Sequence, residues 1–166
     1  MARRAFFSFH YGRDIWRANV VRNSWITHPD RDTAGFWDNS LWESVKSQPH
    51  VVSRMIDEAI ERSSATVVLI GRETHTRRFV LKEIERTIDM GKGLLGVYIN
   101  RIPNHSGEQD PAGASPFDRL NVRVDGRMQS LSEVVPTYFW DGNDGYNNLG
   151  RWVDEAARSP PWLLEA

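Results

Sequence analysis

Short continuous apolar segments recur along the chain and predict the strands of a sheet. Segments of about four to eight such residues are typical of strands that are buried on both faces, as in a parallel sheet. A weaker apolar segment at Trp25–Thr27 predicts one further strand. The clear segments are Ala5–Phe9, Ala65–Ile70, Leu94–Ile99 and Thr137–Trp140.

The intervals between these segments carry the periodicity of amphipathic helices. One helix is expected to begin at Pro49, because a proline lacks only an N–H that the first helical position does not use. A helix capped by Asp14 is expected to bury Trp16. Two more helices are expected, one capped by Thr76 and one that begins near Tyr146.

The alternation of strands and helices indicates an α/β protein. We expect a flavodoxin-like architecture, with a central, mostly parallel five-stranded sheet and helices on both of its faces. The length of 166 residues predicts one domain, residues 1–166. Two segments, about 28–48 and 100–136, are predicted to be irregular insertions, and loops of that length are often functional.

Composition and charge exclude several classes of protein. The chain has 21 Lys and Arg residues against 22 Asp and Glu residues, which gives a formal net charge of −1. This balance disfavours nucleic acid or a membrane surface as a partner. With no cysteine, no signal sequence and no membrane span, we expect a cytoplasmic protein. The five histidines are scattered and predict no metal site.

Polar and titratable residues follow the predicted strands, at the edge of the sheet where open α/β proteins bind ligands. Loops at that edge are also polar simply because they face water, and this alternative stays open. Several familiar motifs are missing: no P-loop, H-E-x-x-H or G-x-S-x-G occurs, and no G-x-G-x-x-G follows the first strand. The segments concerned begin at His10, Gly71, Asn100 and Asp141.

One of these segments leads from the predicted strand Ala65–Ile70 through a polar loop into a helix. Glu83 lies in the second turn of that helix, four residues after Phe79 and so on the same face. A carboxylate at this place could face a pocket above the first strand. The alternative is a solvated glutamate that pairs with Arg86 or Arg78.

Several motifs, taken in order, resemble the TIR (Toll/interleukin-1 receptor) domain family, and specifically the bacterial TIR-like proteins of the Thoeris antiphage system. Arg4–Tyr11 resembles the family's first strand, with its F-[IV]-S-[YF] core. Residues 68–84 are similar to the family's V-L-I-G…T…[KRS]-W-V-x-x-E-I block, with Phe79 in place of the usual Trp. Asn19–Trp25 and Ala34–Glu43 resemble the first-helix exit and the region around the BB loop.

This resemblance implies an enzyme that cleaves NAD at the nicotinamide–ribose bond, of the NAD glycohydrolase or ADP-ribosyl cyclase type. It implies that Glu83 is the catalytic glutamate and that NAD is the substrate, with neither a cofactor nor a metal. The product would be a cyclic ADP-ribose isomer or an ADP-ribose conjugate, a second messenger that activates an effector on a separate chain. Self-association and a phage-derived trigger are also expected.

A single carboxylate suits this reaction. Breaking the N-glycosidic bond builds positive charge on the ribose, and a nearby carboxylate can hold the ribose hydroxyls and stabilise that charge. Nicotinamide is already a good leaving group, so a second carboxyl group is not needed as a general acid. Cyclisation also needs water to be kept out and a nucleophile of the same molecule to be brought near.

Seven residues are candidate contacts to NAD. Ser8 and His10 end the first strand and could contact the nicotinamide or its ribose, although His10 also suits a plain surface position. Tyr11 could stack on a base or simply cover the edge of the sheet. Phe7, as an aromatic residue in a strand, also suits the core, and Asp38 and Asn39 also suit the cap of the following turn. The remaining candidates are Phe7, Asp38, Asn39 and Phe79.

Two other functions stay open at this point. A TIR domain can act as a non-catalytic adaptor through homotypic assembly, and the presence of Glu83 is the feature that favours an enzyme over an adaptor. The second alternative is a small nucleotide- or deoxyribose-processing enzyme of the flavodoxin-like class, which would also use a glutamate.

Overall fold

Five parallel strands form the central sheet of the computed structural model, which describes residues 3–29, 31–34 and 44–162. The strand order is β2-β1-β3-β4-β7, and every neighbouring pair is parallel. The predicted α/β class is therefore confirmed, with a sheet that is parallel throughout. The strands are β1 (Arg3–Ser8), β2 (Arg31–Ala34), β3 (Ala65–Ile70), β4 (Gly93–Tyr98) and β7 (Thr137–Phe139).

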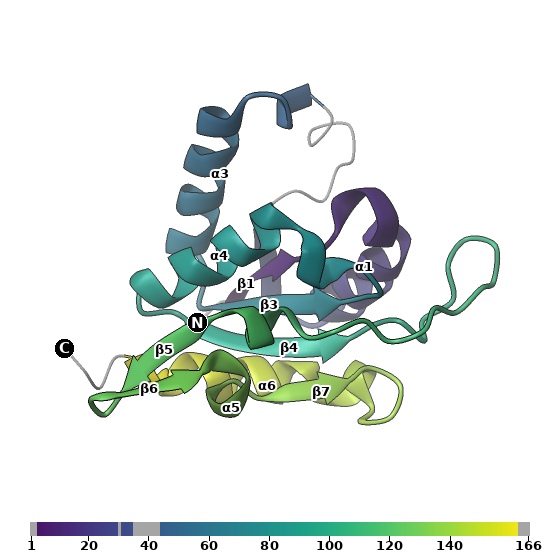
Figure 1. Cartoon of the computed structure of the whole chain (residues 1–166). Helices are drawn as coiled ribbons and strands as arrows, with labels where there is room; N and C mark the ends of the chain where they lie inside the picture. Colours follow the sequence, from purple (N-terminus) through teal and green to yellow (C-terminus); the bar gives the residue numbers. More distant parts are fainter. Residues whose placement is uncertain (1–2, 30, 35–43, 163–166) are drawn as a thin grey trace.

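Four longer helices cover the two faces of this sheet (Figure 1): α1 (Tyr11–Ile26), α3 (Pro49–Glu61), α4 (Arg78–Asp89) and α6 (Gly145–Arg158). Helices α1 and α6 contact each other on one face, and α3 and α4 contact each other on the opposite face. This is the flavodoxin-like arrangement that the sequence predicts. Among the described residues, no helix is both long and apolar enough to cross a membrane.

The helix starts agree with the sequence signals to within a few residues. Helix α3 has Pro49 in its first turn, as predicted, and α6 begins at Gly145, next to the expected Tyr146. Thr76 does not cap α4. It ends the short 3-10 helix η1 (Thr74–Thr76), and α4 begins two residues later at Arg78.

The fifth strand lies later in the chain than the sequence predicts. The expected strand at Trp25–Thr27 is wrong, because these residues form the last turn and the C-cap of α1. The fifth strand is β2, at the edge of the sheet, and its sequence RDTA lacks an apolar segment. Its Asp32 carboxylate pairs with Arg4 of β1 at 2.7 Å, so an edge strand with one partner can be polar.

Helix α1 presents a different face to the core from the one predicted. It begins at Tyr11 and is capped by His10, whose side chain accepts a hydrogen bond from the Arg13 backbone N–H. Trp16 is 53% exposed, whereas Asp14 and Arg17 are buried. The prediction failed because Asp14 and Arg17 form an ion pair inside the protein, which a reading of apolar positions assigns to the surface.

Residues 100–136, predicted as irregular, contain secondary structure. They form the 3-10 helix η2 (Pro116–Arg119), the antiparallel hairpin of β5 (Asn121–Val124) with β6 (Arg127–Ser130), and the short helix α5 (Leu131–Val134). Asp125 and Gly126 make the hairpin turn with φ of 51° and 76°. A two-residue Asp-Gly turn is a strong hairpin signal, and the sequence-based interpretation overlooked it.

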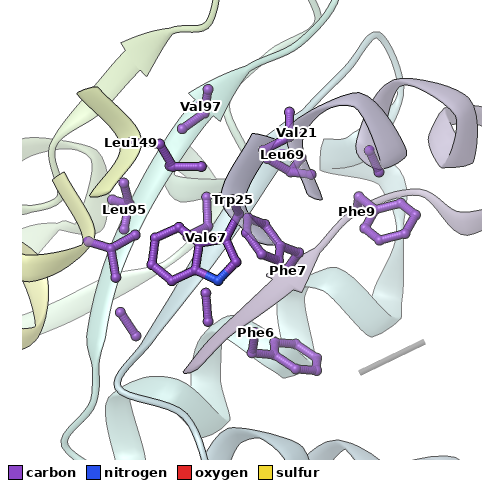
Figure 2. Close-up of a cluster of buried hydrophobic side chains, with 14 of the residues drawn as sticks. Phe6, Phe7, Phe9, Val21, Trp25, Val67, Leu69, Leu95, Val97 and Leu149 are labelled. Atoms are coloured by element: carbon purple, nitrogen blue, oxygen red, sulfur yellow. The ribbon is translucent and has the colours of Figure 1, made fainter. Parts of the chain in front are cut away.

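A cluster of aromatic and aliphatic side chains joins the sheet to the helices α1, α3 and α6 (Figure 2). Phe7 of β1 meets Trp25 of α1 edge-on, with the ring centroids 6.3 Å apart. The Trp25 indole N–H also donates to the Asp32 carbonyl at 2.7 Å, which joins α1 to the edge strand β2. Trp25 is therefore the side chain that fixes α1 against β1 and β2.

We expect Trp25→Ala to lower the free energy of unfolding by about 3–5 kcal/mol, because it leaves a large cavity in the core. Trp16→Ala, on the exposed face of the same helix, should cost less than about 1 kcal/mol. Urea denaturation of the two variants and the wild type checks this. Equal losses for the two variants would contradict the packing of α1 described above.

Candidate active site

Glu83 lies on the buried face of α4, where it points toward β1. It shares this face with Val80, Ile84 and Thr87, and its own exposed fraction is 0%. The alternative of a solvated glutamate paired with a neighbouring arginine is wrong. Arg86 instead pairs with Asp57 of α3 at 2.8 Å.

Two hydroxyl groups from the first strand and the first helix hold the Glu83 carboxyl group. The Ser8 hydroxyl donates to Glu83 Oε1 at 2.9 Å, and the Tyr11 hydroxyl donates to Oε2 at 3.4 Å. Ser8 ends β1 and Tyr11 begins α1, so both come from the carboxyl edge of the sheet. The structure thus brings together three of the residues that the sequence singled out.

Burial raises the pKa of the Glu83 carboxyl group from its ordinary value of 4.5 to about 8. The hydrogen bonds from Ser8 and Tyr11 favour the charged form, but they only partly oppose the effect of burial on this pKa. Glu83 is therefore mostly protonated at neutral pH in this conformation. A carboxyl group with so strongly shifted a pKa, at the edge where such folds bind ligands, is a candidate functional group.

A small cavity of about 20 Å³ lies at the end of β1 next to these residues. His10 is one of the residues that line this cavity. Its pKa is lowered, mainly by burial and secondly by the positive charge of Arg77. Because His10 Nδ1 accepts the Arg13 N–H at 3.1 Å, the neutral ring carries its proton on Nε2. The cavity is lined by Phe9, His10, Tyr11, Gly12, Arg77, Phe79 and Val80.

The other predicted contacts divide into three groups. Phe79 lines the small cavity, as a residue near Glu83 should. Phe7 does not join the site, because strand alternation turns its ring to the opposite face, against Trp25. Asp38 and Asn39 lie outside the residues that the structure describes.

Sequence reasoning missed a buried charge cluster beside the site, formed by Asp14, Arg17 and Asp110. The Arg17 guanidinium lies 3.1 Å from a carboxylate oxygen of each aspartate and also donates to the carbonyl oxygens of Ile102 and Glu108. It therefore fastens the segment after β4 to α1. The i,i+3 spacing of Asp14 and Arg17 was the only signal of this cluster in the sequence.

Gly71, where β3 ends, is required by this cluster. A Cβ atom at Gly71 would lie 2.2 Å from Asp14 Oδ2, so no larger residue fits without moving the buried carboxylate. The close approach joins the exit of β3 to the first turns of α1. Among the described residues, no group of three His, Asp or Glu side chains is arranged to hold a metal ion.

Fold and site together define a flavodoxin-like α/β protein with a buried glutamate at the carboxyl edge of its sheet. The family model described as "Thoeris protein ThsB, TIR-like domain" matches residues 6–104, which include Ser8, Tyr11 and Glu83. The chain therefore belongs to this family, as its motifs predicted. A similar protein is "Putative cyclic ADP-D-ribose synthase ThsB1" of Bacillus cereus (strain MSX-D12), which is 33% identical over an alignment of 192 positions that covers 93% of this chain and 100% of that protein.

The raised pKa of Glu83 predicts a pH dependence of stability. Between pH 4.5 and about 8 the folded protein keeps a proton on Glu83 that the unfolded chain has released. This group therefore makes the free energy of unfolding fall as pH rises through that window, by about 1.4 kcal/mol per pH unit. Glu83→Gln should remove this part of the slope and be more stable than the wild type at pH 7, by up to about 3 kcal/mol.

Urea denaturation of the wild type and Glu83→Gln at several values between pH 5 and 8 measures this difference. Other titrating groups act alike in both proteins, so the difference between the two slopes isolates Glu83. Parallel slopes would show that the Glu83 carboxyl group has an ordinary pKa in the folded protein.

Proposed function

We propose that this protein cleaves NAD at the nicotinamide–ribose bond, with Glu83 as the catalytic carboxylate. The observation that carries the proposal is the isolated Glu83 carboxyl group, fully buried and held by Ser8 and Tyr11 at the carboxyl edge of a parallel sheet. The name of the similar B. cereus protein, a cyclic ADP-D-ribose synthase, supports NAD as the substrate and a cyclic product.

The chemistry follows from charge. When the bond between ribose C1′ and the nicotinamide nitrogen breaks, the electron pair leaves with nicotinamide, which becomes neutral, and the ribose gains oxocarbenium character. An ionised Glu83 would stabilise that positive charge and hold the ribose hydroxyls. Attack on C1′ by a nucleophilic atom of the adenosine half gives a cyclic product, and attack by another acceptor gives a conjugate. Attack by water, which releases a proton to solvent, gives ADP-ribose.

The positively charged nicotinamide ring of NAD favours ionisation of Glu83, because an opposite charge nearby lowers the pKa of a carboxyl group. The Ser8 and Tyr11 hydroxyls would then stabilise the carboxylate through their hydrogen bonds. The His10 Nε2–H is a further donor beside the cavity, suited to a carbonyl or hydroxyl oxygen of the substrate. The Phe79 ring, which lines the same cavity, would contact the nicotinamide or ribose.

Access to Glu83 requires a conformational change. Its exposed fraction of 0% means that no ribose atom reaches the carboxyl group until a covering side chain such as Tyr11 or Phe79 moves. This suits an enzyme that is held inactive until a phage-derived trigger or self-association rearranges the site. A diffusible cyclic ADP-ribose-type product would then carry the signal to a separate effector protein.

The first test is mass spectrometry of NAD incubated with the protein, alone and with lysate of phage-infected cells. We expect nicotinamide release and a cyclic ADP-ribose-type product from the wild type. Glu83→Gln should lose at least about a thousandfold in rate, since it removes the group that stabilises the transition state. Glu58→Gln, an exposed glutamate of α3, is the matched control and should act as the wild type does.

The outcome separates the candidate functions. Release of nicotinamide that does not depend on Glu83 would make the site proposed here wrong. No turnover by any form under either condition would leave the non-catalytic adaptor, which acts through homotypic assembly, as the better account. Cleavage of nucleosides or deoxyribose phosphates in place of NAD would favour the small nucleotide-processing enzyme.

The pKa of Glu83 also predicts the pH profile of cleavage. The rate kcat/KM should rise with pH up to about 8, because only the ionised carboxylate stabilises the transition state. Ser8→Ala removes a hydrogen bond that favours the charged form, so its profile should shift to higher pH. Steady-state rates measured across pH 6 to 10 check this, and identical profiles would contradict the role given to Ser8.

A further inference from the structure

A second hollow lies between α3 and α4, and Phe79 forms a wall of both this groove and the small cavity beside Glu83. The groove has a volume of about 550 Å³, against about 20 Å³ for the small cavity. Its volume is typical of small-molecule sites, which measure about 300–1,000 Å³. The groove is lined by Pro49, Ser53, Arg78, Phe79, Leu81, Lys82 and Glu85.

Two cations, Arg78 and Lys82, face this groove. Arg78 and Lys82 make no ion pair with any residue in the described part of the chain. In the same helix, Arg86 pairs with both Asp57 and Asp89. Glu85 is the one carboxylate among the described residues that line the groove, so these residues together carry a net positive charge.

The position of Lys82 is fixed by the opposite helix. Its ammonium group donates a hydrogen bond to the Ser53 hydroxyl of α3, across the groove. An ammonium group held in this way lines the groove and does not extend into solvent. It remains able to donate to an anion, because an ammonium group has three N–H donors.

The spacing along α4 relates the groove to the catalytic carboxyl group. Phe79 lies four residues before Glu83 and three before Lys82, so its side chain neighbours both of theirs on the surface of α4, whereas Glu83 and Lys82 point to different sides of the helix. In NAD, only a few covalent bonds separate ribose C1′ from the nearer phosphate. A ribose at Glu83 would therefore place the diphosphate near the cations of the groove.

We infer that this groove binds the diphosphate of NAD through Arg78 and Lys82. The inference rests on the proposed NAD cleavage and adds the part of the site that holds the non-reacting half of the substrate. The two phosphates carry two negative charges, which match the two unpaired cations. Charge-assisted hydrogen bonds to phosphate are stronger than neutral ones, and they weaken as salt screens them.

The test uses ADP, which carries the diphosphate without the bond that is cleaved, and adenosine, which lacks phosphate. Isothermal titration calorimetry of the full chain at low salt should show ADP binding to the wild type. Arg78→Gln combined with Lys82→Gln should weaken it at least tenfold, equal to about 1.4 kcal/mol. Adenosine affinity should be the same in all of these proteins. At position 82 alone, Lys82→Gln should weaken ADP binding, whereas Lys82→Arg keeps the charge and should bind ADP as the wild type does.

Glutamine is used at position 82 because it removes the charge but can still hydrogen-bond to Ser53. A thermal melt of each variant checks that the contact between α3 and α4 remains. Arg158→Gln, an exposed cation in the last turn of α6 on the other face of the sheet, is the matched control and should bind ADP as the wild type does.

Two results would overturn the inference: ADP binding that is equal in the wild type and the doubly substituted protein, or no ADP binding by the folded wild type at millimolar concentration. The inference and the proposed function fail separately. ADP binding that depends on both cations, in a protein that never cleaves NAD, supports the diphosphate site and rejects the catalytic proposal. NAD cleavage that requires Glu83, together with ADP binding that does not depend on the two cations, supports the catalytic proposal and rejects the diphosphate site.

Discussion

The Glu83 carboxyl group, enclosed between α4 and β1, is the constraint on which the site depends. A buried carboxyl group needs hydrogen-bond partners, and the Ser8 and Tyr11 hydroxyls provide them from positions 75 and 72 residues earlier in the chain. These contacts form only when α4 packs over β1. The same contacts therefore hold two distant segments together and lower the pKa of Glu83, which burial raises by more.

The charge cluster of Asp14, Arg17 and Asp110 lies beside the same edge of the sheet and ties α1 to the segment after β4. Arg17 is 2% exposed, so its contacts with both aspartates and with two backbone carbonyls are shielded from water. Asp14 also packs against Gly71 at the exit of β3. The strand ends that carry the candidate site are thereby connected to α1 and to the segment after β4.

In the proposed arrangement, the distribution of charge around Phe79 matches two parts of NAD that carry opposite charge, the nicotinamide ring and the diphosphate. The carboxyl group of Glu83 lies on one side, where the ribose that carries the positively charged nicotinamide ring would react. The unpaired Arg78 and Lys82 lie in the groove that Phe79 also lines, where the negatively charged diphosphate would bind. A substrate with charges of both signs would then be oriented by electrostatics before the reacting bond reaches Glu83.

The sequence by itself determined the fold class, four of the five sheet strands and the family, and it singled out Glu83 as a candidate, because apolar segments and ordered motifs are local signals. It misplaced the edge strand β2 and the buried face of α1, because a polar strand and a buried ion pair lack an apolar pattern. Only the tertiary structure decided that Ser8 and Tyr11 contact Glu83 while Phe7 turns away to Trp25. It also decided that Arg78 and Lys82 share a groove with Phe79. The contacts of Ser8 and Tyr11 with Glu83 join residues that are distant in the chain, and the groove depends on how α3 packs against α4. Both are consequences of packing, which local patterns in the sequence do not encode.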